Sequence, residues 1–239
     1  MNNTIPSVIG AARVAERLAR EPGGVAQSRL AAELDLSQST CYRILQSLAA
    51  CGWATKSPGG LWRCGGAFAT MAAATSEAML DLDSVRAALN RVATRHGVAS
   101  KFSIRRGIEQ FVAVRAEREG EVRVTGSEGV SFSVVEGSSG AALLADSGDA
   151  AAKALFSAAP PSKTDLKFLL DALAHLRKLG WCGRRRIADW PVSALSSPVR
   201  DASGAVAGAL TFLVPENRFT DPSLPRLLLK TADSLSQRK

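Results

Sequence analysis

Two short stretches with helical spacing of apolar residues lie next to each other in residues 25–48. Asp35 and Leu36 form the turn between them, and Ser37 is of the residue type that caps a helix N-terminus. The second stretch has apolar residues spaced along one face of a helix, namely Cys41, Ile44, Leu45 and Leu48. This pattern predicts a helix-turn-helix with its second helix over residues 37–50. On this stretch alone, any other two-helix hairpin fits equally well.

The neighbouring segments extend the motif. Residues 7–20 have apolar positions at helical spacing and are followed by Glu-Pro-Gly-Gly, which ends a helix because Pro and Gly disfavour its continuation. Residues 53–55 and 61–63 favour two short strands around a Ser-Pro-Gly-Gly turn. Three helices followed by a small basic hairpin is the order of a winged helix-turn-helix.

The solvent side of the predicted second helix is polar. It offers donors, acceptors and a cation, which are short enough near the helix N-terminus to reach base edges in a DNA major groove. On the hairpin, two cations are placed to contact phosphate, or are simply solvated. The candidate DNA-binding residues are Gln38, Ser39, Thr40, Tyr42, Arg43, Gln46, Lys56 and Arg63. Thr40 has a second interpretation as a phosphate contact or a support for the helix.

After the hairpin, residues 67–80 are rich in Ala and predict a linker helix. Residues 81–83 are expected to break it, with Asp83 or Ser84 as the cap of a further helix over residues 85–96. Gly97 is expected to end that helix.

The remaining chain changes from helical to alternating spacing. Three strands are expected over residues 98–105, 110–115 and 121–125, followed by an irregular loop over residues 129–137. A small helix over residues 139–145, extended by residues 150–156, and a long helix over residues 164–179 come next. Strands over residues 194–200 and 205–213, joined by a hairpin turn, precede a last helix over residues 222–235. Mostly antiparallel strands with helices packed on them predict an α+β domain.

The length and composition of the chain limit the kinds of partner that it is expected to bind. With 239 residues, the chain is long enough for one or two domains with a buried core, and 46% of its residues are hydrophobic. Its formal net charge is +8. A positive balance favours partners that carry phosphate. No apolar run has the length of a membrane span, and residues 1–20 lack the basic start and apolar block of a signal peptide. We therefore expect a cytoplasmic protein that has no membrane partner.

Catalytic and metal chemistry are not expected. The chain has 4 Cys without a Cys-x-x-Cys pair and 2 His, so no metal site is predicted. No Gly-x-Ser-x-Gly elbow, phosphate-binding loop or His cluster is present, so we expect no enzyme and no cofactor.

A set of short N-terminal segments follows a family pattern, namely Ser7-Val8, Ala12-Arg13-Val14, Leu30-Ala31, Leu34-Asp35-Leu36, Ser39 to Leu45, Leu48, Gly52-Trp53 and Cys64-Gly65. In these segments the chain resembles the IclR family of bacterial transcriptional regulators. Asp35-Leu36 stands where the family has Gly-Leu, and Ile44 stands for a Leu. The resemblance implies a winged helix-turn-helix domain over residues 1–66, a linker helix over residues 67–82 and an effector-binding and oligomerisation domain over residues 83–239.

The second half resembles the effector domain of that family, which is related to GAF-type ligand-binding domains. The matching segments are residues 137–145, 176–181 and 196–210. Effectors in the family are often small carboxylates or aromatic acids. Carried over by position, the effector-binding residues are Ser138, Ser139, Arg184, Ala194, Thr211 and Leu213.

This chain departs from the family at two of those positions. Arg184 lies where the family places an acidic run, and Ala194 replaces a Cys. Arg184 either clamps an anionic effector or points to solvent or a partner domain. The cost of burying an arginine without a partner favours the second arrangement. A third possibility is that the ordinary effector has been lost.

The resemblance thus implies a DNA-binding transcriptional regulator whose operator binding responds to a small organic, anionic effector. It implies double-stranded DNA as a partner and a homodimer or homotetramer. The alternative is a ligand-binding or assembly protein that uses its helix-turn-helix for protein contacts.

Overall fold

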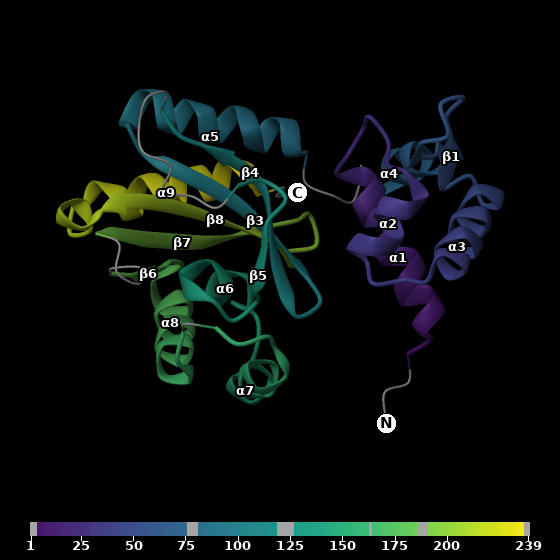
Figure 1. Ribbon diagram of the computed structural model, residues 1–239. Helices are drawn as coiled ribbons and strands as arrows, with labels where there is room; N and C mark the ends of the chain where they lie inside the picture. The colour runs from purple at the N-terminus through teal and green to yellow at the C-terminus, as the bar shows by residue number, and fades with distance from the viewer. Residues whose placement is uncertain (1–3, 76–80, 119–126, 163, 186–190, 237–239) are drawn as a thin grey trace. The chain divides into compact units, whose positions relative to one another are not determined.

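The computed structural model describes residues 4–75, 81–118, 127–162, 164–185 and 191–236. The chain divides into two compact units, residues 1–77 and residues 78–239. The first unit runs from purple to blue in Figure 1, and the second from teal to yellow.

The N-terminal unit is a winged helix-turn-helix, as predicted. Its elements are α1 (Pro6–Ala19), α2 (Gln27–Glu33), α3 (Gln38–Ala50), β1 (Ala54–Lys56), β2 (Trp62–Cys64) and α4 (Ala67–Thr75). The two strands pair antiparallel, each one residue later than the sequence predicted. Val14, Leu30 and Leu45 from the three helices are buried in one core with Trp62 of the hairpin. The hairpin is therefore part of the core of this unit.

The turn between α2 and α3 depends on a residue in an uncommon conformation. Asp35 has φ +55°, and among the described residues it is the one non-glycine with a positive φ. Asp tolerates this left-handed region better than most residues, which explains how it replaces the Gly of the family pattern. Ser37 then caps α3 by accepting a 3.1 Å hydrogen bond from the amide of Thr40, as predicted.

The C-terminal unit is an antiparallel sheet of strand order β5-β4-β3-β8-β7-β6 with helices on both faces. The strands are β3 (Ala99–Arg106), β4 (Glu109–Ala116), β5 (Ser131–Ser133), β6 (Cys182–Arg184), β7 (Val192–Arg200) and β8 (Val206–Pro215). The helices are α5 (Leu82–His96), α6 (Gly137–Leu143), α7 (Asp149–Ala158), α8 (Leu166–Leu179) and α9 (Ser223–Leu235), with a 3-10 turn η1 (Glu216–Arg218) before α9. The predicted α+β class is confirmed.

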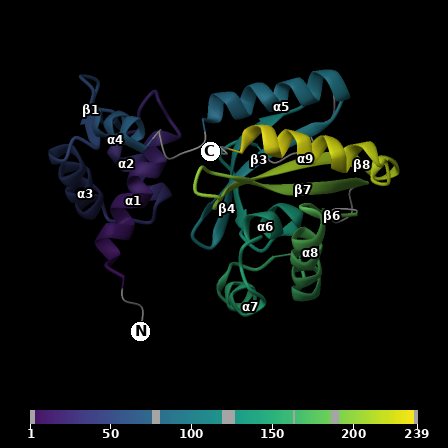
Figure 2. The same cartoon turned by 180° about the vertical axis from the view of Figure 1, so that it is seen from behind.

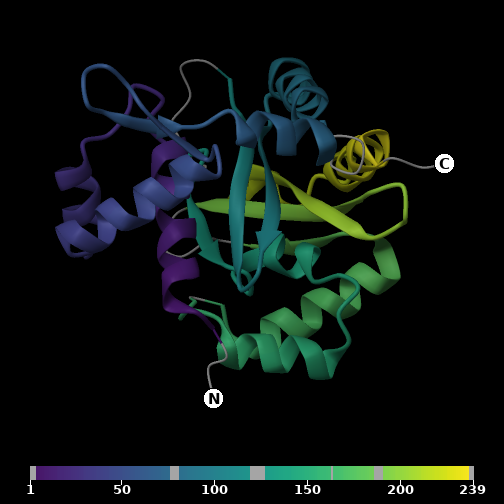
Figure 3. The ribbon, with the colours of Figure 1, turned by 90° about the vertical axis from the view of Figure 1, so that its right-hand side faces the viewer.

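The sheet separates two helical layers. Helices α5 and α9 lie on one face, and α6 and α8 lie on the other, as views from the front and from behind both show (Figures 1 and 2). Viewed from the side, α5 and α9 run next to each other while α7 and α8 lie across the sheet from them (Figure 3). We call the side covered by α6 and α8 the α6 face.

Each layer has its own core. On the α5 and α9 side, Phe102 of β3 and Phe212 of β8 are fully buried. Gly208 packs flat against Phe102, because a Cβ at Gly208 would lie 2.0 Å from the ring atom Cζ. On the α6 face, Leu169 and Leu173 of α8 pack with Ala209 of β8.

The structure corrects several predicted boundaries. Helix α5 begins at Leu82, and its cap is Asp81, whose carboxylate accepts a 3.0 Å hydrogen bond from the amide of Asp83. The sequence misplaced this cap because Asp81 and Asp83 are equally good candidates by type, and Leu82 adds no buried position to the helical pattern. Gly97 ends the helix in the left-handed conformation, as predicted. Helices α6 and α7 are separate, since the chain leaves the first at Leu143 and starts the second after Gly148.

Two short strands were missed. The segment predicted as an irregular loop contains β5, which pairs with β4, and the helical segment predicted to begin at residue 139 begins at Gly137. Strand β6 pairs with β7 at the opposite edge of the sheet. Three-residue edge strands have too few positions to alternate visibly, so only the pairing reveals them. The strand predicted over residues 121–125 lies outside the described residues.

Candidate nucleic-acid interface and effector site

Helix α3 has one buried side and one exposed side. Cys41, Ile44, Leu45 and Leu48 face the core. The predicted contact residues of this helix are exposed without exception, and Tyr42 keeps 48% of its surface accessible. The helix is thus held by its apolar side and leaves its polar side available.

Arg43 is the cation on that exposed side. Within the part of the chain that the structure describes, its guanidinium makes no hydrogen bond or ion pair, and only its backbone carbonyl accepts a bond, from Ser47. Thr40 is used differently, because its hydroxyl oxygen is 2.8 Å from Ser37 Oγ within the cap. This geometry supports a role for Thr40 in holding the helix start. A shallow groove of about 450 Å³ runs between α1 and α3 beside both residues.

The two hairpin cations have partners of their own. Lys56 Nζ lies 5.7 Å from the centroid of the Trp62 ring. Arg63 donates a 3.1 Å hydrogen bond from Nε to the carbonyl of Gly23, which holds the hairpin to the loop after α1. Both side chains remain exposed. Lys56 is therefore the freer of the two toward a phosphate.

The α6 face of the sheet carries polar side chains in a row. In the antiparallel pairing, Ser196 of β7 lies opposite Thr211 of β8, and Thr211 lies opposite Lys101 of β3. Residues directly opposite in a sheet point to the same face. The row therefore runs across three strands under helix α6.

Ser138, Ser196 and Thr211 form a buried hydroxyl row. Ser196 Oγ donates to Ser138 Oγ at 2.9 Å and is also 2.9 Å from Thr211 Oγ1. All three are at most 2% exposed. Hydrogen bonding offsets the cost of burying these hydroxyls, so the row fastens α6 to the sheet.

Ser139 points to a different strand. Its hydroxyl donates a 2.7 Å hydrogen bond to Gln110 Oε1 on β4, and Gln110 Nε2 donates to the carbonyls of Ser133 and Glu136. The two serines of the predicted set thus contact strands on opposite sides of β3. Ala194 and Leu213, which lie opposite each other, are buried with Ala99 and Val192.

Arg184 has partners within the protein. Its Nη1 donates a 2.6 Å hydrogen bond to Thr164 Oγ1, and its guanidinium lies 5.0 Å from the centroid of Phe168. Thr164 Oγ1 also accepts a 2.7 Å bond from the amide of Gly137. Arg184 therefore connects the edge strand β6 to the start of α6 and to α8.

Four polar residues of this region were not among the predicted site residues. Gln110, Ser196 and Thr164 join the predicted residues to their neighbours, and Lys101 lies in the polar row itself. Lys101 and Gln110 lie within the predicted strands, each next to a phenylalanine, which is a signal that the sequence does contain. Thr164 is brought into the region by tertiary contacts.

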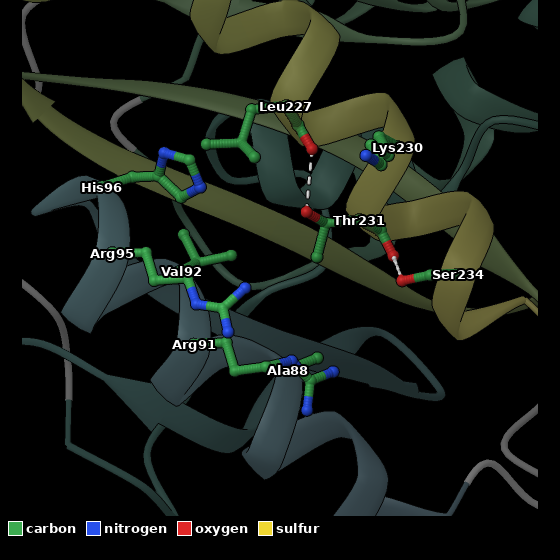
Figure 4. Close-up of a pocket in the computed structure, with 9 residues that line it drawn as sticks. All are labelled: Ala88, Arg91, Val92, Arg95, His96, Leu227, Lys230, Thr231 and Ser234. Atoms are coloured by element: carbon green, nitrogen blue, oxygen red, sulfur yellow. Dashed lines mark hydrogen bonds between the residues drawn. The ribbon is translucent and has the colours of Figure 1, made fainter.

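A separate hollow of about 210 Å³ lies between α5 and α9, on the opposite side of the sheet (Figure 4). Arg91, Arg95, His96 and Lys230 line it, and no carboxylate does. Its hydroxyls are satisfied locally, since Thr231 donates to the carbonyl of Leu227 and Ser234 to that of Thr231. No predicted site residue belongs to it.

Among the residues that the structure describes, no group of three or more His, Cys, Asp or Glu side chains is placed to hold a metal ion. No helix among those residues has the length and apolar character to cross a membrane.

The two units together define a winged-helix DNA-binding domain joined to a sensory α+β domain. Family models match both parts, namely the IclR helix-turn-helix domain over residues 10–58 and the bacterial transcriptional regulator IclR C-terminal domain over residues 75–237. The chain belongs to the IclR family of bacterial transcriptional regulators. It has an N-terminal helix-turn-helix domain and a C-terminal effector-binding domain.

Solved structures share the fold. The IclR transcriptional regulator from Alicyclobacillus acidocaldarius is 22% identical, with a TM-score of 0.70 and 98% of each chain covered. An IclR homolog from Microbacterium hydrocarbonoxydans, complexed with 4-hydroxybenzoate, is 20% identical, with a TM-score of 0.73 and 96% of this chain and 97% of that chain covered. The repressor BlcR from Agobacterium tumefaciens is 22% identical, with a TM-score of 0.60 and both chains covered fully, at 100%. No curated protein is similar enough in sequence to count as a match.

Proposed function

We propose that this protein binds an operator through α3 and the wing, and that a small organic anion in the C-terminal unit changes this binding. The proposed operator binding rests on one observation, that the polar side of α3 is exposed while its apolar side is buried. Gln38, Ser39, Tyr42 and Arg43 contact bases or phosphates in the major groove. Thr40, Gln46, Lys56 and Arg63 add phosphate contacts around the groove.

The operator-bound form is at least a homodimer in this proposal. A single recognition helix buries too little surface for tight specific binding, so a second copy on a palindromic site supplies the rest. Pairing of two dimers into a tetramer extends the same arrangement. A protein that acts on chromosomal DNA in this way works in the cytoplasm.

The effector binds on the α6 face, among Ser138, Ser139, Arg184, Ala194, Thr211 and Leu213. Hydroxyl groups and a guanidinium beside apolar Ala194 and Leu213 suit a small molecule with a polar and an apolar end. The homolog from Microbacterium hydrocarbonoxydans holds 4-hydroxybenzoate, an aromatic acid, which supports the same chemical class here.

Effector binding acts on DNA binding by shifting a population. A ligand that binds one arrangement of the dimer better than another biases the spacing of the two α3 helices, with α4 (Ala67–Thr75) in the connecting segment. The alternative is an assembly protein whose helix-turn-helix contacts protein, and the exposed polar side of α3 fits that role less well.

The salt dependence of DNA affinity distinguishes the DNA-binding regulator from the assembly protein. Fluorescence anisotropy with a DNA fragment from upstream of the protein's own gene measures affinity over a series of salt concentrations. Several phosphate contacts make the logarithm of the affinity fall linearly with the logarithm of salt, with a slope of about −0.9 per phosphate neutralised. A scrambled fragment of equal length is the control for specificity. If the protein does not bind the DNA fragment even at low salt, the regulator is refuted and the assembly protein is favoured.

A further inference from the structure

Lys101 is a lysine enclosed within a sheet. It lies in the middle of β3 with Ser100 and Phe102, both fully buried, as its neighbours in sequence. The pairing places it opposite Thr211 of β8 on one side and Arg115 of β4 on the other. Its side chain therefore shares the α6 face with the hydroxyl row formed by Ser138, Ser196 and Thr211.

The ammonium of Lys101 has little within the protein to offset its charge. Its Nζ lies 5.2 Å from the centroid of the Phe132 ring on β5. Within the described residues it makes no hydrogen bond or ion pair. Glu136, just before α6, is the charged group that acts on it favourably, and only from a distance. Part of the side chain remains accessible, since Lys101 is intermediate in exposure.

An enclosed cation without a hydrogen-bonded partner costs free energy, and an anion placed against it recovers that cost. The cation is a single ammonium whose neighbours toward β8 are neutral hydroxyls, while Arg115 on the β4 side is already paired with Glu117. This set suits one carboxylate, which accepts a charge-assisted hydrogen bond from an ammonium and ordinary ones from hydroxyls. A doubly charged phosphate group would leave one charge uncompensated.

From this geometry we infer that Lys101 binds the carboxylate of a monoanionic organic effector and makes the protein selective for acids over their neutral analogues. The inference rests on the proposed effector site and names its anchoring residue. Arg184 is the weaker candidate for that task, because its guanidinium already donates to Thr164 and stacks over Phe168.

The proposal predicts a pH signature. Burial lowers the pKa of Lys101 from 10.5 to about 8, and Glu136 opposes this shift only in part. The ionisable groups that the neighbouring strands bring to this side include Arg115 of β4, its ion-pair partner Glu117 just after β4, and Arg184 and Cys182 of β6. Burial raises the pKa of the Cys182 thiol to about 12, so that thiol stays neutral. Acid affinity should be flat from about pH 6, where the carboxylate is ionised, to about pH 8, and fall about tenfold per pH unit above that.

The experiment uses the full chain and matched acid and amide pairs, namely benzoate and benzamide, phenylacetate and phenylacetamide, and butyrate and butyramide. Binding is measured by thermal shift and then by isothermal calorimetry. We expect at least one acid to bind the wild type, with its amide at least about tenfold weaker, a change of about 1.4 kcal/mol. Lys101→Met should remove that selectivity, and Lys101→Arg should retain it in part because it keeps the charge.

Lys167→Met is the matched control, since the Lys167 side chain is 89% exposed on α8 and its loss should leave acid binding unchanged. Equal binding of acid and amide, full acid selectivity in Lys101→Met, or no binding of any acid in the set would each overturn the inference. DNA binding without any acid is measured on the same samples. If the wild type does not bind DNA, the proposed regulator is refuted, while an acid selectivity that depends on Lys101 would still support the assignment of Lys101.

Discussion

The hydroxyl of Ser196 on β7 donates a 2.9 Å hydrogen bond to the hydroxyl of Ser138 on α6, across a sequence separation of 58 residues. The same Ser196 oxygen is 2.9 Å from Thr211 Oγ1 on β8. One buried serine thus joins a helix and a neighbouring strand beneath the proposed effector site. Changes at this position should affect both stability and ligand binding.

Ser196→Ala should destabilise the C-terminal unit by about 1–3 kcal/mol, because it leaves buried hydroxyls without their partner. Chemical denaturation of the full chain measures this. Ser157→Ala on α7 is the control, since Ser157 is exposed and bonds only to the carbonyl of Lys153. Equal stability of Ser196→Ala and the wild type would mean that water or another group takes over the hydrogen bonds.

Arg43→Ala should weaken operator binding by about 1–3 kcal/mol if the guanidinium contacts a base. Its exposed position and lack of internal partners among the described residues predict an unchanged unfolding temperature. Anisotropy titration and thermal denaturation report the two effects separately. A large fall in stability would instead identify Arg43 as a structural residue.

Lys56→Ala on the wing tests a phosphate contact. It should weaken binding to specific and scrambled DNA alike and reduce the salt slope by about 1. Arg63 is a poorer choice for this test, because its bond to the carbonyl of Gly23 also holds the hairpin in place. A change in sequence preference would argue for base contact by Lys56.

Asp35→Ala should destabilise the N-terminal unit by about 1 kcal/mol, since a left-handed backbone is costly for a residue with a Cβ and no local polar compensation. Asp35→Gly should be at least as stable as the wild type, because glycine adopts φ +55° without strain. Denaturation of both variants side by side checks the order. The reverse order would show that the Asp35 carboxylate stabilises the turn by more than the backbone strain.

The lowered pKa of Lys101 should make the free energy of unfolding depend on pH. Because its pKa falls from 10.5 to about 8 in the folded protein, folding favours the neutral amine. The penalty for holding the ammonium is fully present below about pH 8 and is relieved as the pH rises toward 10.5. Lys101→Met should therefore exceed the wild type in stability at pH 7, and the difference should shrink in alkali. A difference that is constant over this range would contradict the burial of a titrating amine.

Several features of this protein follow from local sequence. The helix-turn-helix was predictable because Cys41, Ile44, Leu45 and Leu48 repeat at helical spacing, and the Ser37 cap depends on contacts within one turn. The hairpin, the cap at Gly97 and the long helix α8 are likewise determined by residues close together in the chain. The family pattern along the whole chain then implied the order of the two domains.

Other features depend on the tertiary structure. The row of Ser138, Ser196 and Thr211 arises from the docking of α6 onto the hairpin of β7 and β8, and the place of Lys101 opposite Thr211 arises from the pairing of β3 with β8, two strands far apart in sequence. The partner of Arg184 is Thr164, which no local pattern indicates. Strand pairing and helix docking depend on long-range packing, so they decide which polar residues meet. The sequence by itself determined the type of each side chain and most helices, and the tertiary structure decided which of those side chains form a site.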